Sequence, residues 1–262
     1  TRLFPAEDGY FCGLMMMETF SCANNCLTEL PDLFTAQSIY TMLSADFSSN
    51  DISALENGDE WRGINTGSLN LSNNRFEELP ARIMKSGSKI ETLMLSYNGM
   101  RTIAEGALTG PYSYYLSTVD LSFNRLKEIP YNDFSALNMP YLYGIDLSSN
   151  AFEAFPYAPL GINTLTVMSI RQQRDDAGNR TLREWPTGLY TCPKMSAFYI
   201  GSNDLRKIED TISPYILLFE IKDNPNISID LSPVCPYIEM GYYELIYDST
   251  QDIRGCDALN LD

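Results

Sequence analysis

The feature that most constrains the fold is a motif that returns about every 24 residues. It is clearest in residues 69–80 (LNLSNNRFEELP), 119–130 (VDLSFNRLKEIP) and 145–156 (IDLSSNAFEAFP). Each copy contains alternating apolar residues, then a polar anchor, then a second apolar pair before a proline. A period of this length is typical of solenoid proteins, in which each copy forms one coil of the chain.

The polar anchor identifies nine copies within residues 15–230. We predict a structural role for the anchors, which are Asn25, Asn50, Asn74, Asn98, Asn124, Asn150, Gln173, Asn203 and Asn224. A mostly apolar pair precedes each anchor by three and five residues, and most anchors are followed by another apolar pair. Because one copy cannot bury its own apolar face, the copies must stack. The alternating segments then form a parallel sheet, with one strand from each copy.

The anchors explain how such a stack can satisfy its buried backbone groups. An Asn amide at the turn into the core can bond carbonyl and N–H groups of neighbouring coils. Gln173 breaks the Asn series, and we expect the ladder of anchors to be interrupted there. Replacing Gln173 with Leu should therefore cost less stability than replacing Asn98 or Asn124.

The LxxLxLxxN pattern followed by xLxxIP resembles the leucine-rich repeat family, with bacterial internalins and surface lipoproteins of gut Bacteroidetes among the similar proteins. The resemblance covers roughly residues 15–230. It implies an α/β solenoid, a right-handed superhelix with a parallel β-sheet on its concave face and irregular or 3-10 return segments. It also implies a non-catalytic, protein-binding module of a bacterial protein that is extracellular, at the cell surface or periplasmic.

Composition narrows the function further. Asp and Glu total 34 against 18 Lys and Arg, which gives a formal charge of −16 and disfavours nucleic acid and anionic membranes as partners. Histidine is absent, so Ser-His and Cys-His nucleophile pairs are excluded. No apolar run reaches the roughly 18 residues of a membrane helix. We expect no cofactor, no bound metal and a monomer.

The two ends depart from the repeat. Residues 1–14 read as the second half of a copy, so we expect them to continue from an upstream repeat or domain; a degenerate cap is the alternative. Residues 231–262 are predicted to form a C-terminal cap with a last strand in residues 240–247. Cys235 and Cys256 flank that strand and are predicted to form a disulfide. Cys22 takes an inward Leu position and should be buried and unpaired, or paired only with Cys12 or Cys26.

The seventh copy carries an insertion, residues 174–180 (RDDAGNR), within a cluster of arginines. Inserted loops on solenoids often belong to the binding surface, so we include Arg171, Arg174 and Arg180 among the candidate partner-binding residues. The alternative is a solvated loop whose arginines pair with Asp175, Asp176 and Glu184.

The outward positions of the strands supply the remaining binding candidates. They lie four and two residues before each anchor. The second row is mostly serine and carries no functional signal, whereas the first row is acidic and contains two large side chains. The candidate partner-binding residues of the sheet and its margins are Asp46, Met94, Asp120, Asp146 and Tyr199, with Tyr97, Phe123 and Tyr143 at the margins.

Acidic groups beside aromatic ones suit a basic or polar protein partner. The alternatives are a solvated acidic face, a glycan-binding or adhesion module with the aromatics as stacking platforms, and the specificity arm of an enzyme whose catalytic domain lies outside this chain. Asp120 and Asp146 should lie on adjacent strands, where paired carboxylates can serve catalysis or bind calcium. Both aspartates simply follow the common LDLS form, and no cleft-forming insertion surrounds them.

Overall fold

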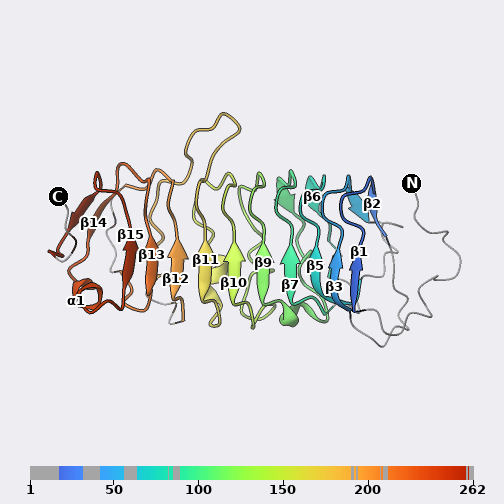
Figure 1. The fold of residues 1–262 in the computed structure, drawn as a ribbon, viewed down its shortest axis with the longest axis horizontal. Helices are drawn as coiled ribbons and strands as arrows, with labels where there is room; N and C mark the ends of the chain where they lie inside the picture. Colours follow the sequence, from blue (N-terminus) through green and yellow to red (C-terminus); the bar gives the residue numbers. More distant parts are fainter. Residues whose placement is uncertain are drawn as a thin grey trace, which may run out of the picture.

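One long parallel sheet organises the chain. The structure is a computed structural model that describes residues 18–31, 42–55, 64–81, 83–84, 89–189, 192, 194–206, 208, 212–257 and 259. Its ten-stranded sheet consists of β1 (Thr19–Ser21), β3 (Met42–Asp46), β5 (Thr66–Asn70), β7 (Thr92–Met94), β9 (Thr118–Asp120), β10 (Gly144–Asp146), β11 (Val167–Ser169), β12 (Ala197–Tyr199), β13 (Leu218–Glu220) and β15 (Glu244–Ile246). Figure 1 shows these strands side by side, all pointing the same way. The predicted parallel solenoid is confirmed.

The return segments contain little regular structure. Three short parallel pairs lie there: β2 (Glu29–Leu30) with β4 (Ala54–Leu55), β6 (Glu78–Leu79) with β8 (Thr102–Ile103), and β14 (Ser228–Asp230) with β16 (Asp252–Arg254). The helices of the described residues are short: η2 (Ser113–Tyr115), η3 (Ala158–Gly161) and α1 (Cys235–Glu239). The irregular and 3-10 return segments implied by the repeat are therefore observed.

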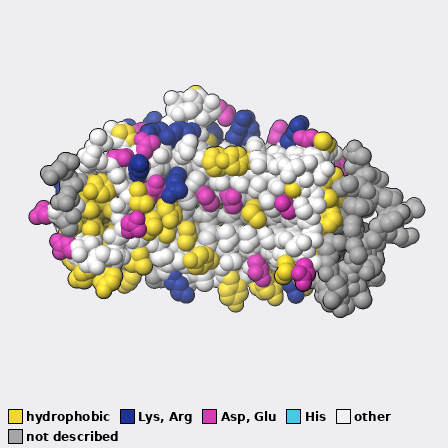
Figure 2. Space-filling model, viewed as in Figure 1, with side chains coloured by type: hydrophobic (Ala, Val, Ile, Leu, Met, Phe, Trp, Pro, Cys, Tyr) yellow, Lys and Arg dark blue, Asp and Glu magenta, His cyan; other side chains and the backbone are white. Residues whose placement is uncertain are grey.

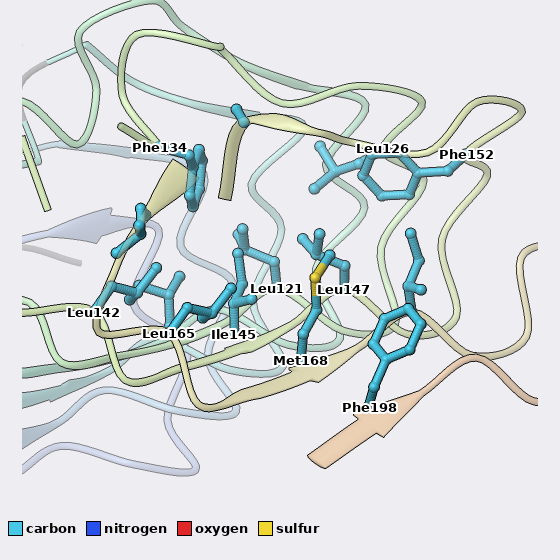
Figure 3. Packing of buried hydrophobic residues seen from close by; sticks show 14 of the residues in the cluster. Leu121, Leu126, Phe134, Leu142, Ile145, Leu147, Phe152, Leu165, Met168 and Phe198 are labelled. Carbon is cyan, nitrogen blue, oxygen red and sulfur yellow. The ribbon is translucent and has the colours of Figure 1, made fainter. Parts of the chain in front are cut away.

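The core lies between the sheet and the return segments. Figure 3 shows Leu121 and Leu147 pointing into it from the sheet and Leu126 and Phe152 pointing into it from the opposite side. All four side chains are fully buried. They occupy the apolar positions three residues before and two residues after successive anchors, so each coil contributes the same contacts to its neighbours. Burial of such side chains is worth about 1.5–3 kcal/mol each.

The anchors join each coil to the one before it. Asn124 donates from Nδ2 to the Leu95 carbonyl of the preceding coil (3.1 Å) and to Leu121 O of its own coil (3.0 Å). Its Oδ1 accepts the Met100 N–H at 3.2 Å, again from the preceding coil. Asn50, Asn74, Asn98, Asn150 and Asn224 repeat this arrangement. Asn203 also bonds the preceding coil, but it accepts the N–H of the anchor Gln173 itself. Asn25 is exposed, and its side-chain amide donates to Cys22 O and Ala23 O of its own coil.

The expected interruption of the ladder at Gln173 is wrong. Gln173 is fully buried, donates to Leu147 O at 2.9 Å and accepts the Phe152 N–H at 3.2 Å. Both partners belong to the preceding coil, as they do for an Asn anchor. The amide performs the same task from a side chain one methylene longer, and the inserted residues leave the coil only after it.

The C-terminal segment extends the ladder. β15 pairs with β13, so the strand expected in residues 240–247 is present. Gln251 is buried and donates from Nε2 to the Ile221 carbonyl at 2.8 Å, which gives this coil an anchor that the repeat template missed. The predicted disulfide between Cys235 and Cys256 is also present, with the two Cα atoms 5.2 Å apart.

Two predictions for the N-terminal end of the chain are not confirmed. Cys22 is only half-buried against the core, rather than fully buried, in the first coil that the structure describes. The interpretation of residues 1–14 as part of an upstream repeat falls outside the described residues.

The anchor geometry predicts the cost of removing each amide. Asn124→Leu and Gln173→Leu should each lower the free energy of unfolding by about 1–3 kcal/mol, because a buried carbonyl and a buried N–H lose their partners. Asn25→Leu is the matched control and should cost clearly less. Urea denaturation of the three variants measures this; a Gln173 variant as stable as the parent would contradict the observed ladder.

The disulfide predicts a separate contribution from the C-terminal coil. Replacing Cys235 and Cys256 together with Ala should destabilise this coil by about 2–4 kcal/mol, because the link restricts the unfolded chain. Thermal unfolding with and without reductant tests it. The parent protein should lose stability on reduction and the variant should not; equal unfolding midpoints in all four samples would show that the link is dispensable.

Candidate functional site

The sheet face, meaning the outward side chains of the ten strands, contains the first predicted row in register. The strand pairing aligns Ser21, Asp46, Asn70, Met94, Asp120, Asp146, Ser169, Tyr199, Glu220 and Ile246 across the sheet. A further outward row, two residues earlier on each strand, was missed from the sequence. Towards the C-terminus it becomes apolar at Val167, Ala197 and Leu218, where Figure 2 shows hydrophobic side chains gathered over β12 and β13.

Asp120 and Asp146 are direct neighbours on β9 and β10. Asp120 Oδ1 accepts the Ser122 N–H at 2.9 Å and its hydroxyl at 2.6 Å, and Asp146 Oδ1 accepts the Ser148 N–H at 2.8 Å. Within the described part of the chain, neither carboxylate has a Lys or Arg within ion-pair distance. Two negative charges therefore lie together on the sheet face, and serine groups are their only hydrogen-bond donors among the described residues.

Tyr97 and Phe123 form an exposed aromatic pair on the side of the sheet where the strands have their C-terminal ends. Their ring centroids are 4.1 Å apart and their planes differ by 9°. The two side chains are 50% and 44% exposed, although a stacked pair of this kind would be buried in an ordinary core. Each ring uses one face on the other ring. The coils on either side of the pair have Asn73 and Ser149 at the same template position.

The backbone beneath this pair is left-handed. The residue directly before each anchor has φ between 53° and 58°: Asn24, Ser49, Asn73, Tyr97, Phe123, Ser149, Gln172, Ser202 and Asp223. Asn tolerates this conformation, whereas a large aromatic residue adopts it at a cost. Tyr97 and Phe123 are thus exposed and adopt a left-handed backbone conformation that large aromatic residues disfavour.

Arg171 forms a second cluster on the sheet face. Its guanidinium carbon lies 4.3 Å from the centroid of the Tyr199 ring, and its Nε donates to a carboxylate oxygen of Glu220. These residues follow or belong to β11, β12 and β13, so the cluster bridges three coils. It combines a ring face, a carboxylate and a guanidinium.

The inserted loop is fixed by its own arginines. Arg174 and Arg180 face each other in an antiparallel bridge at the base of the loop. Arg174 Nη1 donates to Ser202 O at 2.7 Å, and Arg180 donates to Asn203 O at 2.7 Å and to Asp223 Oδ1 at 2.6 Å. Most of these partners are backbone carbonyls of the next two coils. The guanidinium groups therefore hold the loop against the solenoid.

The tip of the loop carries the acidic residues. Figure 1 shows the loop rising beyond the ends of the strands, between β11 and β12. Asp176 lies 3.9 Å from both Arg101 and Arg125, and hydrogen bonds from the Asn179 side chain and backbone lower the pKa of Asp175. The alternative pairing of the loop arginines with Asp175, Asp176 and Glu184 is not what the structure shows, since Arg180 pairs with Asp223 and Arg183 with Asp204.

The binding residues predicted from the sequence do not all lie at one site. Tyr143 is exposed but directly precedes β10, whereas Tyr97 and Phe123 follow their strands, so Tyr143 lies at the opposite edge of the sheet. Asp46 and Met94 share the row of Asp120. No group of three or more Cys, Asp or Glu side chains in the described residues has the arrangement of a metal site. The helices described there are also too short to cross a membrane.

Comparisons with solved structures identify similar solenoids. A leucine-rich repeat protein of Bacteroides eggerthii is 46% identical, with a TM-score of 0.89, and the match covers 95% of this chain and 42% of that one. A leucine-rich repeat protein of Bacteroides thetaiotaomicron is 43% identical, also with a TM-score of 0.89, over 95% of this chain and 31% of that one. This chain thus spans less than half the length of either protein.

More distant structures share the fold. The functional domain of InlJ from Listeria monocytogenes is 14% identical, with a TM-score of 0.60, over 93% of this chain and 48% of that one. No family model matches the sequence, and no curated protein matches it either. The repeat, the anchor ladder and the similarity to two Bacteroides proteins lead to one conclusion: the chain belongs to the leucine-rich repeat proteins, whose solenoids typically serve as binding modules.

Proposed function

We propose that the chain is a non-catalytic module that binds a protein partner through the sheet face, with its centre at Asp120, Asp146, Tyr97 and Phe123. One observation carries the proposal: two large aromatic side chains are stacked in the open, on left-handed backbone, on a face where two neighbouring carboxylates have no cationic partner among the described residues. Strain kept at an exposed position is a property of functional sites. Exposed aromatics are also common anchors of protein interfaces.

In this proposal, the other candidate residues contribute to partner binding in different ways. Asp46, Met94 and the Arg171–Tyr199–Glu220 cluster flank the centre along the sheet and extend the contact surface. Arg174 and Arg180 act through the loop that they hold, since their guanidinium groups already donate to the next coils. Tyr143 belongs to the opposite margin and would be reached only by a partner that covers the whole width of the sheet.

The chemistry also supports a location and an oligomeric state. A disulfide between Cys235 and Cys256 is typical of proteins outside the reducing cytosol, which supports our proposal that the module is extracellular, at the cell surface or periplasmic. We propose that it acts as a monomer, without a cofactor.

A glycan is the second candidate ligand, and the Tyr97–Phe123 pair is the observation that favours it, because sugar rings stack on aromatic faces. A glycan array separates the two functions. Glycan binding that is lost in Tyr97→Ala and unchanged by salt would support an adhesion module. Binding of a protein that weakens as salt rises would support the protein-binding function.

Charge reversal tests whether the sheet face carries binding. Lys at both Asp120 and Asp146 should weaken binding of the partner by about ten-fold or more, since complementary charges would become repulsive. Lys at both Glu77 and Glu78, on the return side, changes the net charge equally and should have a much smaller effect. The partner is captured by cross-linking on the source cell. Equal losses in the two variants would place the function on the return side.

The left-handed backbone predicts that the aromatic pair lowers stability. Tyr97→Asn or Phe123→Asn alone should be nearly neutral, because relief of about 1–2 kcal/mol at the backbone is offset by a lost stacking contact of about 0.5–1.5 kcal/mol. The double variant loses one stacking contact but gains relief twice, so it should be more stable than the parent by roughly 1 kcal/mol or more. Ser149→Asn is the control at the same template position. A double variant that is clearly less stable would show that the pair is there for stability.

A further inference from the structure

We propose that the centre of the sheet face binds an arginine side chain of the protein partner: its guanidinium stacks on the outer face of Phe123 and its charge meets Asp146 and Asp120. This inference rests on the proposed function and adds the chemical group that is recognised. It follows from three features of the described part of the face: a half-exposed ring, carboxylates on the same and the next coil that form no ion pair there, and a cluster elsewhere on the same face that already holds a guanidinium.

The Arg171 cluster shows how this face holds a guanidinium. Arg171 lies over the ring of Tyr199 on β12 and donates to Glu220 on β13. A ring from one coil and a carboxylate from the next coil therefore bind the same planar cation. Such a cation binds best when its plane lies against the ring while its N–H groups reach the carboxylate.

The centre of the face also has a ring and a carboxylate on neighbouring coils, but here the ring lies three residues beyond the aspartate row rather than in it. Phe123 follows β9, and Asp146 lies on β10, the next coil. Among the described residues, Lys89 lies over the Tyr112 and Tyr115 rings, and Arg171 lies over the Tyr199 ring. No Lys or Arg of the described residues lies over the Tyr97 or Phe123 ring. The residue beside Phe123 in the next coil is Ser149, which is too short to cover the ring.

The charges nearby favour arginine from outside the chain. Asp120 and Asp146 have no ion pair among the described residues, and the chain as a whole carries a charge of −16. Arg171 follows the strand next to Asp146, but its guanidinium is held by Tyr199 and Glu220. Arg101 and Arg125 both lie 3.9 Å from Asp176 of the loop. Asp176 therefore offsets the repulsion that these two arginines would exert on an incoming guanidinium.

Three blocked peptides test the inference: Gly-Arg-Gly-Arg-Gly and the same sequence with lysine or with citrulline in place of arginine. Lysine keeps the charge without the planar group, and citrulline keeps the planar group without the charge. Saturation-transfer NMR measures their weak binding to the intact chain. The arginine peptide should bind about two- to five-fold more tightly than the lysine peptide. The citrulline peptide should bind about ten-fold more weakly or not at all.

Matched variants locate the site. Phe123→Asn, which suits the left-handed backbone, should remove the preference for arginine over lysine. Asp120→Asn with Asp146→Asn should weaken the arginine peptide by about ten-fold, whereas Glu77→Gln with Glu78→Gln, an equal change in net charge, should weaken it less than about two-fold. Circular dichroism checks that each variant is folded.

The outcomes separate this inference from the function on which it rests. Equal binding of the arginine and lysine peptides, or equal effects of the two double variants, would overturn the arginine site. If the charge reversal at Asp120 and Asp146 still abolished capture of the cellular partner, the sheet face would remain the binding surface. If that capture also survived, the proposed function would fail as well.

Discussion

The structure depends on one repeated hydrogen-bonding arrangement, in which a buried amide side chain joins each coil to the one before it. At the end of each strand the chain turns into the core, where unpaired backbone groups would be costly. Asn124 satisfies Leu95 O and the Met100 N–H there, and Gln173 and Gln251 do similar work from longer side chains. The apolar contacts supply most of the folding energy, but these amides align each coil with its neighbour.

This alignment also builds the candidate binding surface. Because every coil has the same register, residues at one template position form a straight row, and charges or rings on adjacent coils become neighbours. Asp120 and Asp146 are brought together in this way, as are Tyr97 and Phe123. The left-handed residue before each anchor belongs to the same turn, so the scaffold presents an aromatic side chain there despite its backbone preference. The fold itself thus assembles the surface, and a partner need not order it.

The sequence predicts well the features that depend on spacing and less well those that depend on contacts. The period locates the strands, the first outward row and most anchors, and the pair Cys235–Cys256 follows from its place around the last strand. The left-handed turn residues escape prediction because only some are Asn, and none is Gly. Gln173 keeps its place in the ladder because its longer side chain still reaches Leu147 O and the Phe152 N–H, and this reach is not evident from residue type. The contacts of Arg174 and Arg180 involve carbonyls 23 to 43 residues away, which no local pattern reveals.

Native-state hydrogen exchange tests the anchor ladder most directly. The Met100 N–H is bound by Asn124, and the Leu126 N–H is bound by Asn150, at 3.2 and 2.9 Å. In Asn124→Leu, the Met100 amide should lose most of its protection while the Leu126 amide keeps its own, because each anchor protects the coil before it. Unchanged protection at Met100, or equal loss at both amides, would contradict the claim that individual anchors hold neighbouring coils together.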